Sequence, residues 1–170
     1  HKLIDAVESN EAMSLSETYC NAFSKVLLDM QMDMSLKADS LTLPSISILM
    51  QERDVLDVEA VYIARNFLKR EIVRELGADI QAQYASLNIA CEYSLESKEI
   101  ARRKLKNTLL SYIGALKDET PVVNQYKRSN NMTDRLAALS ILANSRGEGK
   151  KEALADFYTR YKENTLVMNK

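Results

Sequence analysis

Few residues in this sequence are of the types that carry out catalysis or bind metal. His1 is the single histidine among the 170 residues, and Cys20 and Cys91 are the only cysteines. A zinc-protease helix needs two histidines four residues apart, and a serine or cysteine nucleophile needs a histidine inside the fold. The glycine pattern of a phosphate loop or a dinucleotide-binding turn is also missing. We therefore expect no catalytic, cofactor-binding or metal-binding residue in this chain.

The two cysteines do not form a recognisable framework. A single pair in a chain of this length differs from the dense disulfides of small secreted domains, and the paired cysteines of a zinc ribbon are absent. We expect Cys20 and Cys91 to be reduced and buried, although the sequence does not exclude a disulfide between them.

A run of positive charge, within residues 98–106, is the first group that invites a functional interpretation. Lys98, Arg102 and Lys106 share one helix face at a spacing of four residues, with Arg103 and Lys104 beside them. Such a face can hold phosphate. Few aromatic residues interleave with it, however, and the formal net charge of the chain is −1 at pH 7. The ordinary interpretation is a solvated helix face, and we expect no nucleic-acid or membrane partner.

The second group that invites a functional interpretation is acidic and consists of Asp54 and Asp57, with Glu59 nearby. Carboxylates at a helix start usually interact with the helix dipole, so a catalytic role is the less favoured interpretation.

The methionines Met30, Met32 and Met34 are the third group. A methionine-rich surface can be an adaptable binding face, but methionine more often fills gaps in a core. We expect these three side chains to be core filler.

The hydrophobic pattern predicts helices along the whole chain. Only four glycines and two prolines interrupt it, whereas an all-β fold needs a turn signal every 8 to 12 residues or so. Apolar residues recur instead at the three- and four-residue spacing of helices. The expected helices occupy, in order, residues 2–7, 14–31, 46–52, 57–87, 94–118, 122–129, 134–145 and 147–163, and another begins at residue 165.

Several polar residues mark where these helices begin or break. Ser14 and Glu17 have the spacing of a capping box, and Ser45 can cap the helix that follows Pro44. Gly77 marks a kink or a break in the longest helix.

The start of the helix near residue 134 carries a dense polar signal. Thr133 is the expected N-cap, and Asp134 in the first turn suits the helix dipole. Asn130 and Asn131 tolerate left-handed geometry, so we expect them to turn the chain there.

Short connections between helices place consecutive helices antiparallel. We expect an all-α fold, an irregular helical array resembling an α-solenoid superhelix, with residues 1–170 as a single helical domain and no repeat of fixed period. No apolar run approaches the roughly 18 residues of a membrane span, and the first residues lack the apolar centre of a signal peptide. We therefore expect a soluble, cytoplasmic protein. The first residue is not methionine, so we also expect a piece of a longer chain.

Two segments carry a family resemblance. YKRSNNMTDRLAALSILANS, at residues 126–145, and ALADFYTRYKENTLVMNK, at residues 153–170, closely resemble the aminopeptidase N (alanyl aminopeptidase) family of zinc metallopeptidases, in its bacterial and plant-type branch. LTLPS, at residues 41–45, and ARRKLKNTLLSYI, at residues 101–113, resemble the same family in the same order. The resemblance covers nearly the whole chain from Leu15 onward.

The resemblance implies a place in a larger enzyme that removes N-terminal residues from peptides. These residues match the first part of the family's C-terminal helical domain, which packs on the catalytic domain and walls the active-site cavity. The implied partners are the catalytic domain of the same polypeptide and, in the parent, the peptide substrate. The family's zinc ligands and catalytic glutamate lie upstream and have no matching residue here. The implied cofactor, zinc, therefore belongs to the parent, and the fragment is expected to be inactive alone.

A second function stays open, a free-standing helical-repeat scaffold that binds a protein partner. Direct contact of Asn130, Asn131 or Asp134 with substrate is the less favoured role for these residues. A domain cut from its neighbours exposes apolar patches, which favour self-association. We expect such patches at both ends, formed by Leu3, Ile4, Val7, Leu166, Val167 and Met168.

Overall fold

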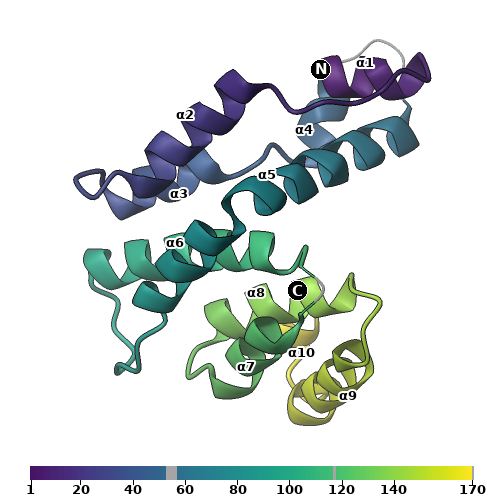
Figure 1. The fold of residues 1–170 in the computed structure, drawn as a ribbon. Coiled ribbons are helices and arrows are strands. Elements are labelled where there is room, and N and C mark those ends of the chain that lie inside the picture. The colour runs from purple at the N-terminus through teal and green to yellow at the C-terminus, as the bar shows by residue number, and fades with distance from the viewer. Residues whose placement is uncertain (53–56, 117, 170) are drawn as a thin grey trace.

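The computed structural model describes residues 1–52, 57–116 and 118–169, and these residues form ten helices and no strand (Figure 1). The predicted all-α class is therefore confirmed. Asp54 and Lys170, both named above, lie outside the described residues. None of the helices is long and apolar enough to cross a membrane. The helices are α1 Lys2–Glu8, α2 Glu17–Leu28, α3 Met34–Leu41, α4 Ile46–Gln51, α5 Val58–Leu87, α6 Ser97–Ile113, α7 Thr120–Arg128, α8 Met132–Ala143, α9 Gly149–Tyr161 and α10 Thr165–Met168.

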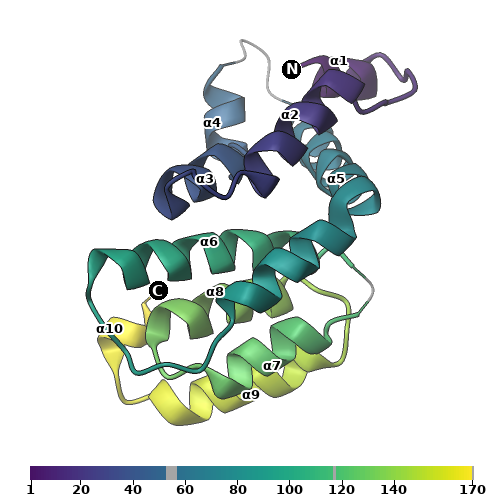
Figure 2. The ribbon, with the colours of Figure 1, turned by 60° about the vertical axis from the view of Figure 1, so that its left-hand side comes forward.

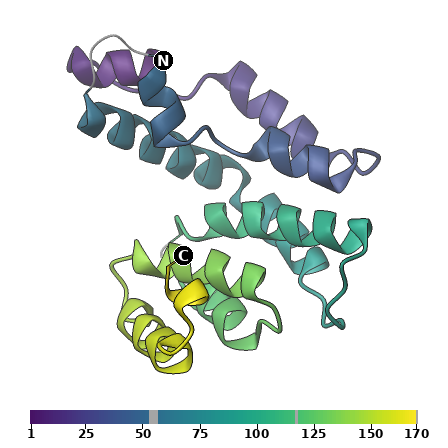
Figure 3. The same ribbon diagram turned by 180° about the vertical axis from the view of Figure 1, so that it is seen from behind.

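Helix α6 lies at the centre of the array. It packs against α3 and α5 on one side and against α7 and α8 on the other (Figure 2). Seen from behind, α1 to α4 and α7 to α10 lie at opposite ends of the molecule, with α6 between them (Figure 3). Both ends of the array therefore depend on the side chains that α6 presents.

The main core follows this arrangement. Leu27, Ile72, Leu109 and Leu142 come from α2, α5, α6 and α8, and each is at most 1% exposed. At about 25 cal/mol per Å² of apolar area, each buried leucine or isoleucine stabilises the fold by about 2 kcal/mol relative to an exposed one. The hydrophobic effect therefore holds together helices that are far apart in sequence.

A smaller core closes the N-terminal end. Ile4 of α1 packs with Ala60, Val61 and Ala64 of α5, and Leu3 and Val7 are partly buried against them. The expected apolar patch at this end was therefore wrong, because α1 folds back onto α5.

The C-terminal end differs. Leu166 is 82% exposed and Met168 is exposed, whereas Val167 packs against the main core. Two of the three apolar residues expected on this surface are therefore found there.

The longest predicted helix, 57–87, is confirmed as α5. Asp57 is its N-cap, and its Oδ1 accepts a hydrogen bond of 2.8 Å from the backbone N–H of Ala60. Asp57 therefore lies at a helix start, as the dipole interpretation requires, and it also caps the helix, which was not predicted. Helix α5 continues through Gly77 without a break, since the loss of helix propensity at one glycine, about 1 kcal/mol, is small beside the burial along this helix.

The predicted helix over 14–31 was too long at both ends. Helix α2 begins after Ser16, not at the Ser14 capping box. It ends at Asp29, whose carboxylate accepts hydrogen bonds from the backbone of Gln31 and Met32. Asp33 then caps the separate helix α3. Aspartate competes for backbone amides in this way, which is why it favours turns and caps over helix interiors.

The N-cap of α8 is Asn131, not Thr133 as predicted. The Oδ1 atom of Asn131 accepts a hydrogen bond of 2.9 Å from the backbone N–H of Asp134, so Thr133 lies inside the helix. Asn131 is also extended, with φ −141° and ψ 154°. Among the described residues Asn10 is the only non-glycine residue with positive φ, so the expected left-handed turn at residues 130–131 was wrong.

Two glycines allow a matched test of helix packing. A Cβ on Gly77 would make ordinary contact with Val73, at 3.7 Å, so Gly77→Ala should raise the free energy of unfolding by about 0.5 to 1 kcal/mol through helix propensity. A Cβ on Gly114 would overlap the Cγ2 methyl of Ile141 in α8, so Gly114→Ala should lower it by about 1 to 3 kcal/mol. Urea denaturation measures both. Equal effects of the two substitutions would mean that α6 and α8 do not pack as closely as described.

Candidate functional site

The basic run of α6 turns toward the protein interior. Arg102, Arg103 and Lys106 are only 5% to 7% exposed. Lys98, at the start of the run, is exposed to solvent. The predicted solvated helix face was therefore wrong. Because α6 is covered on both sides, its polar positions also become buried, and each buried charge then needs a partner.

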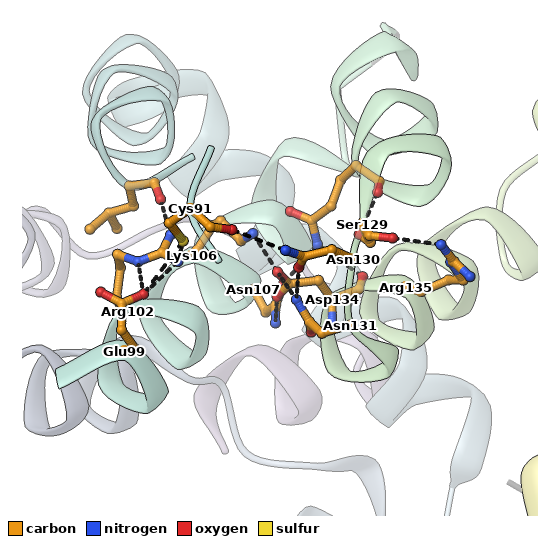
Figure 4. Close-up of polar contacts among 12 residues, drawn as sticks. Cys91, Glu99, Arg102, Lys106, Asn107, Ser129, Asn130, Asn131, Asp134 and Arg135 are labelled. Atoms are coloured by element: carbon orange, nitrogen blue, oxygen red, sulfur yellow. Dashed lines mark hydrogen bonds and ion pairs between the residues drawn. The ribbon is translucent and has the colours of Figure 1, made fainter. Parts of the chain in front are cut away.

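Lys106 finds its partner in Asp134 of α8. Lys106 Nζ lies 2.6 Å from Asp134 Oδ2, and the two side chains are 6% and 5% exposed. Asn107 donates to Asp134 Oδ1 at 2.8 Å, and Asn131 donates to Asp134 Oδ2 at 3.0 Å. Figure 4 shows the three donors converging on this carboxylate. The carboxylate is thus enclosed by one cation and two amides from α6 and the start of α8.

The pKa of Asp134 reflects two opposing effects. Burial by itself raises the pKa of this carboxyl, because it disfavours the charged form. Hydrogen bonds from Lys106, Asn131 and Asn107, together with the positive charge of Lys106, outweigh burial and hold the pKa below its ordinary value. Asp134 is therefore a structural anion and is unsuited to act as a general base.

Gln125 extends this network to α7 and α5. Its Nε2 donates to Asn107 Oδ1 at 2.7 Å and to the Asp134 carbonyl at 3.0 Å, and its Oε1 accepts from the Tyr84 hydroxyl at 3.0 Å. Burial, reinforced by the negative charge of Asp134, raises the pKa of Tyr84 to about 12. We name the residues Tyr84, Lys106, Asn107, Gln125, Asn131 and Asp134 the Asp134 network.

Arg102 fixes the connection between α5 and α6. It donates to the Leu87 carbonyl, to Cys91 Sγ at 3.0 Å and to Glu99 Oε2 at 2.8 Å. Asn130 donates to the Cys91 carbonyl at 3.0 Å (Figure 4). The connection is therefore tied both to α6 and to the turn before α8.

Both cysteines are free, as predicted, but neither is buried. Cys91 is exposed on this connection, and Cys20 is partly exposed. The expected burial was wrong because Cys91 lies in a loop and not on an apolar helix face.

A cleft of about 690 Å³ lies beside the Asp134 network. Tyr84, Lys106, Gln125, Asn131 and Asp134 of the network line it, together with the α5–α6 connection and Asn130. The network's polar groups are already bonded to one another. The described residues also contain no cluster of three or more His, Cys, Asp or Glu side chains that could hold a metal. The hydrogen bonds of the Asp134 network join α5, α6, α7 and α8 to one another.

The methionine prediction was partly right. Met34 packs against the main core, and Met32 is partly buried, as expected of filler. Met30, in contrast, is 79% exposed, because it follows the end of α2 at a turn where the helix no longer directs it inward.

Sequence reasoning missed three members of the network. Tyr84, Asn107 and Gln125 were not singled out, since single polar residues in helices are common and their partners lie 9 to 41 positions away. The only local signal was the polar start of α8, Asn131 and Asp134. The partners of Asp134 on α6, Lys106 and Asn107, became visible only when the helices were placed together.

The chain is similar to a known domain family and to two curated bacterial enzymes. A family model described as a domain of unknown function (DUF3458_C) with ARM repeats matches residues 1–170. Aminopeptidase N of Escherichia coli (strain K12) is 32% identical over 166 residues, which are 96% of this chain and 19% of that protein. Aminopeptidase N of Haemophilus influenzae is 29% identical over 164 residues, again 96% and 19%. The chain thus spans 19% of the length of these curated relatives.

A solved structure shares the fold. The crystal structure of Legionella pneumophila aminopeptidase A in complex with aspartic acid matches with a TM-score of 0.83 at 23% identity, over 99% of this chain and 21% of that chain. The ARM-repeat description and this match agree with the predicted helical array.

The Lys106–Asp134 pair leads to a pH-dependent prediction. Asp134→Asn should lower the free energy of unfolding by about 3 to 5 kcal/mol at pH 7, because it leaves the Lys106 charge buried and unpaired. The pKa of Asp134 is depressed in the folded state, so its contribution is present above the unfolded pKa of about 3.9 and is lost as the pH falls further. The difference between the two proteins should therefore shrink below about pH 4 in urea denaturation series.

Asp39→Asn is the matched control. Asp39 also pairs with a lysine of α6, Lys104, at 2.6 Å, but these side chains are 63% and 40% exposed. Its loss should cost about 1 kcal/mol or less. If both substitutions cost the same, burial of the Lys106–Asp134 pair is not what makes it important.

Proposed function

The chain belongs to the DUF3458_C family of ARM-repeat domains, and from this premise we propose that it is a non-catalytic part of the C-terminal helical domain of a zinc-dependent aminopeptidase. The parent removes N-terminal residues from peptides, and we place it in the cytoplasm. In this proposal the chain packs on the catalytic domain of the same polypeptide and walls the active-site cavity.

The similarity to Aminopeptidase N carries the proposal. It extends over 96% of the chain but includes only 19% of the relative, which is what a domain of a larger enzyme gives. The internal geometry supports a structural role, since the Asp134 network uses its polar groups to hold α5, α6, α7 and α8 together. In this proposal zinc and the residues that bind it lie elsewhere in the parent.

The exposed C-terminal end supports the same proposal. Leu166 and Met168 offer apolar surface that further helices of the parent would cover. In their absence we propose that the isolated chain self-associates through this end.

The isolated 170-residue chain should hydrolyse no alanyl-arylamide and should bind no stoichiometric zinc. The reason is the ligand set, with one terminal histidine and two separated cysteines, whereas a catalytic zinc needs three protein ligands around one position. A colorimetric activity assay and metal analysis of the dialysed protein measure the two properties. Turnover above the rate of a blank without protein, or one tightly bound zinc per chain, would contradict the prediction.

A chimera tests the positive side of the proposal. The matching segment of Escherichia coli Aminopeptidase N is replaced by residues 1–170 of this chain, and hydrolysis of an alanyl-arylamide is compared with the parent and with a version lacking the segment. We expect the chimera to keep at least about a tenth of the parental kcat/KM, a loss of about 1.4 kcal/mol. The deletion version should lose activity, because the catalytic domain loses a packing surface.

The control is the chimera that carries Asp134→Asn. Its activity should fall in parallel with its thermal stability, since Asp134 organises the helices and does not touch substrate in this proposal. A chimera that folds by circular dichroism but has no activity would favour the alternative, a helical-repeat scaffold whose partner is another protein.

A further inference from the structure

A second groove, also of about 690 Å³, carries unbalanced positive charge. It is lined mainly by α6, with parts of α5, α8 and the connection between α3 and α4. Arg65, Lys69, Arg103 and Lys104 line it, and the described part of the chain contributes no aspartate or glutamate to its lining. We name it the basic groove. Positive charge concentrated between low-dielectric walls favours the binding of an anion.

Arg103 is the unusual member of this group. The described residues include four basic side chains that are at most 7% exposed, Lys37, Arg102, Arg103 and Lys106. Lys37 donates to two carbonyls at the end of α2, Arg102 is bonded as described above, and Lys106 is paired with Asp134. Arg103 has no oxygen acceptor in the described part of the chain. A buried guanidinium without an acceptor is costly, since it has lost its water.

Arg103 faces an aromatic ring and lies near the Glu99 carboxylate, whose pKa its positive charge helps to lower. Its guanidinium carbon lies 5.0 Å from the centroid of Tyr93, a contact that replaces part of the lost solvation. Glu99, four residues earlier on α6, is already bound to Arg102 at 2.8 Å. The planar donors of Arg103 are therefore left for a group that enters the groove.

Lys69 adds a second cation without an acceptor. Its Nζ lies 5.9 Å from the centroid of Tyr112, and no hydrogen bond or ion pair joins it to the described residues. Burial, together with the positive charge of Arg65, lowers the pKa of Lys69 to about 8. Arg65 and Lys104 are satisfied by the Pro44 carbonyl and by Asp39. The surplus charge of the groove thus rests on Arg103 and Lys69.

The walls of the groove favour a carboxylate with an apolar body over phosphate. Tyr93, Leu95 and Ile100 line it and are 53%, 72% and 47% exposed. Phosphate carries nearly two charges and is strongly hydrated, so apolar walls oppose its entry. A single carboxylate flanked by apolar side chains matches both the cations Arg103 and Lys69 and the apolar walls. Arginine binds a carboxylate with two parallel hydrogen bonds.

We propose that the basic groove binds the carboxylate of an aspartate or glutamate in an apolar peptide segment, with Arg103 as its direct ligand and Lys69 beside it. The proposal stands independently of the proposed function, since it uses only groups of this chain.

The probe is the peptide N-acetyl-Leu-Asp-Leu-amide, titrated into the 170-residue chain and followed by NMR at the Arg103 side-chain Nε–H and the Lys69 Cε–H groups. We expect saturable shifts at both groups. N-acetyl-Leu-Asn-Leu-amide, which lacks the charge, should bind at least about tenfold more weakly, as the loss of a charge-assisted hydrogen bond requires. Inorganic phosphate should not displace the aspartate peptide at equal concentration.

The matched variants are Arg103→Met and Lys98→Met. Each removes one positive charge from α6, but Lys98 is exposed and lies outside the groove. Arg103→Met should weaken the aspartate peptide about tenfold or more, and Lys98→Met should leave its affinity within about twofold. If Arg103→Met does not fold, the proposal is tested by the affinity of the Lys69→Met variant for the aspartate peptide, which should be weaker, and by the shifts in the unmodified chain.

Four results would overturn the proposal. They are equal binding of the asparagine peptide, equal weakening by Lys98→Met, displacement by phosphate at equal concentration, and the absence of saturable shifts at Arg103.

Discussion

The buried pair of Lys106 and Asp134 is the constraint on which the rest of the structure depends. Two charges that are 6% and 5% exposed are tolerated only when each is paired and hydrogen-bonded. Asp134 meets this condition through Lys106, Asn107 and Asn131. The condition fixes the register of α8 against α6, because a shift of either helix would leave a charge buried without a partner.

The same requirement explains how α6 can be covered on two sides. Arg102 and Lys106 direct their charges to acceptors on the α5–α6 connection and on α8, while Leu105 and Leu109 of the same helix enter the core. Arg103 is the exception, with a ring in place of an oxygen. One helix thus contains both a closed polar clamp and an open basic groove, and the difference lies in whether the chain itself supplies the acceptor.

Helices and caps could be predicted where the interactions that form them join residues close together in the sequence. The apolar spacing in residues 57–87 predicts α5 because burial follows the helical period. Ser45 is recognisable as a cap because it bonds an amide three residues away. The predictions failed where neighbouring polar residues compete for one role, as when Asn131 caps α8 and Thr133 does not, and at Asp29, which ends a helix that the apolar pattern would have continued.

The sequence by itself determined the all-α class, and the described residues form helices and no strand. The tertiary structure decided the environment of its charges. Arg102, Arg103 and Lys106 look like an ordinary solvated face in the sequence, yet they are buried, since helices that come from distant parts of the chain cover α6. The partner of Lys106 lies 28 positions away. Whether a cation is paired, or is left open to a ligand, depends on distances between helices, and no periodicity within a single helix contains that information.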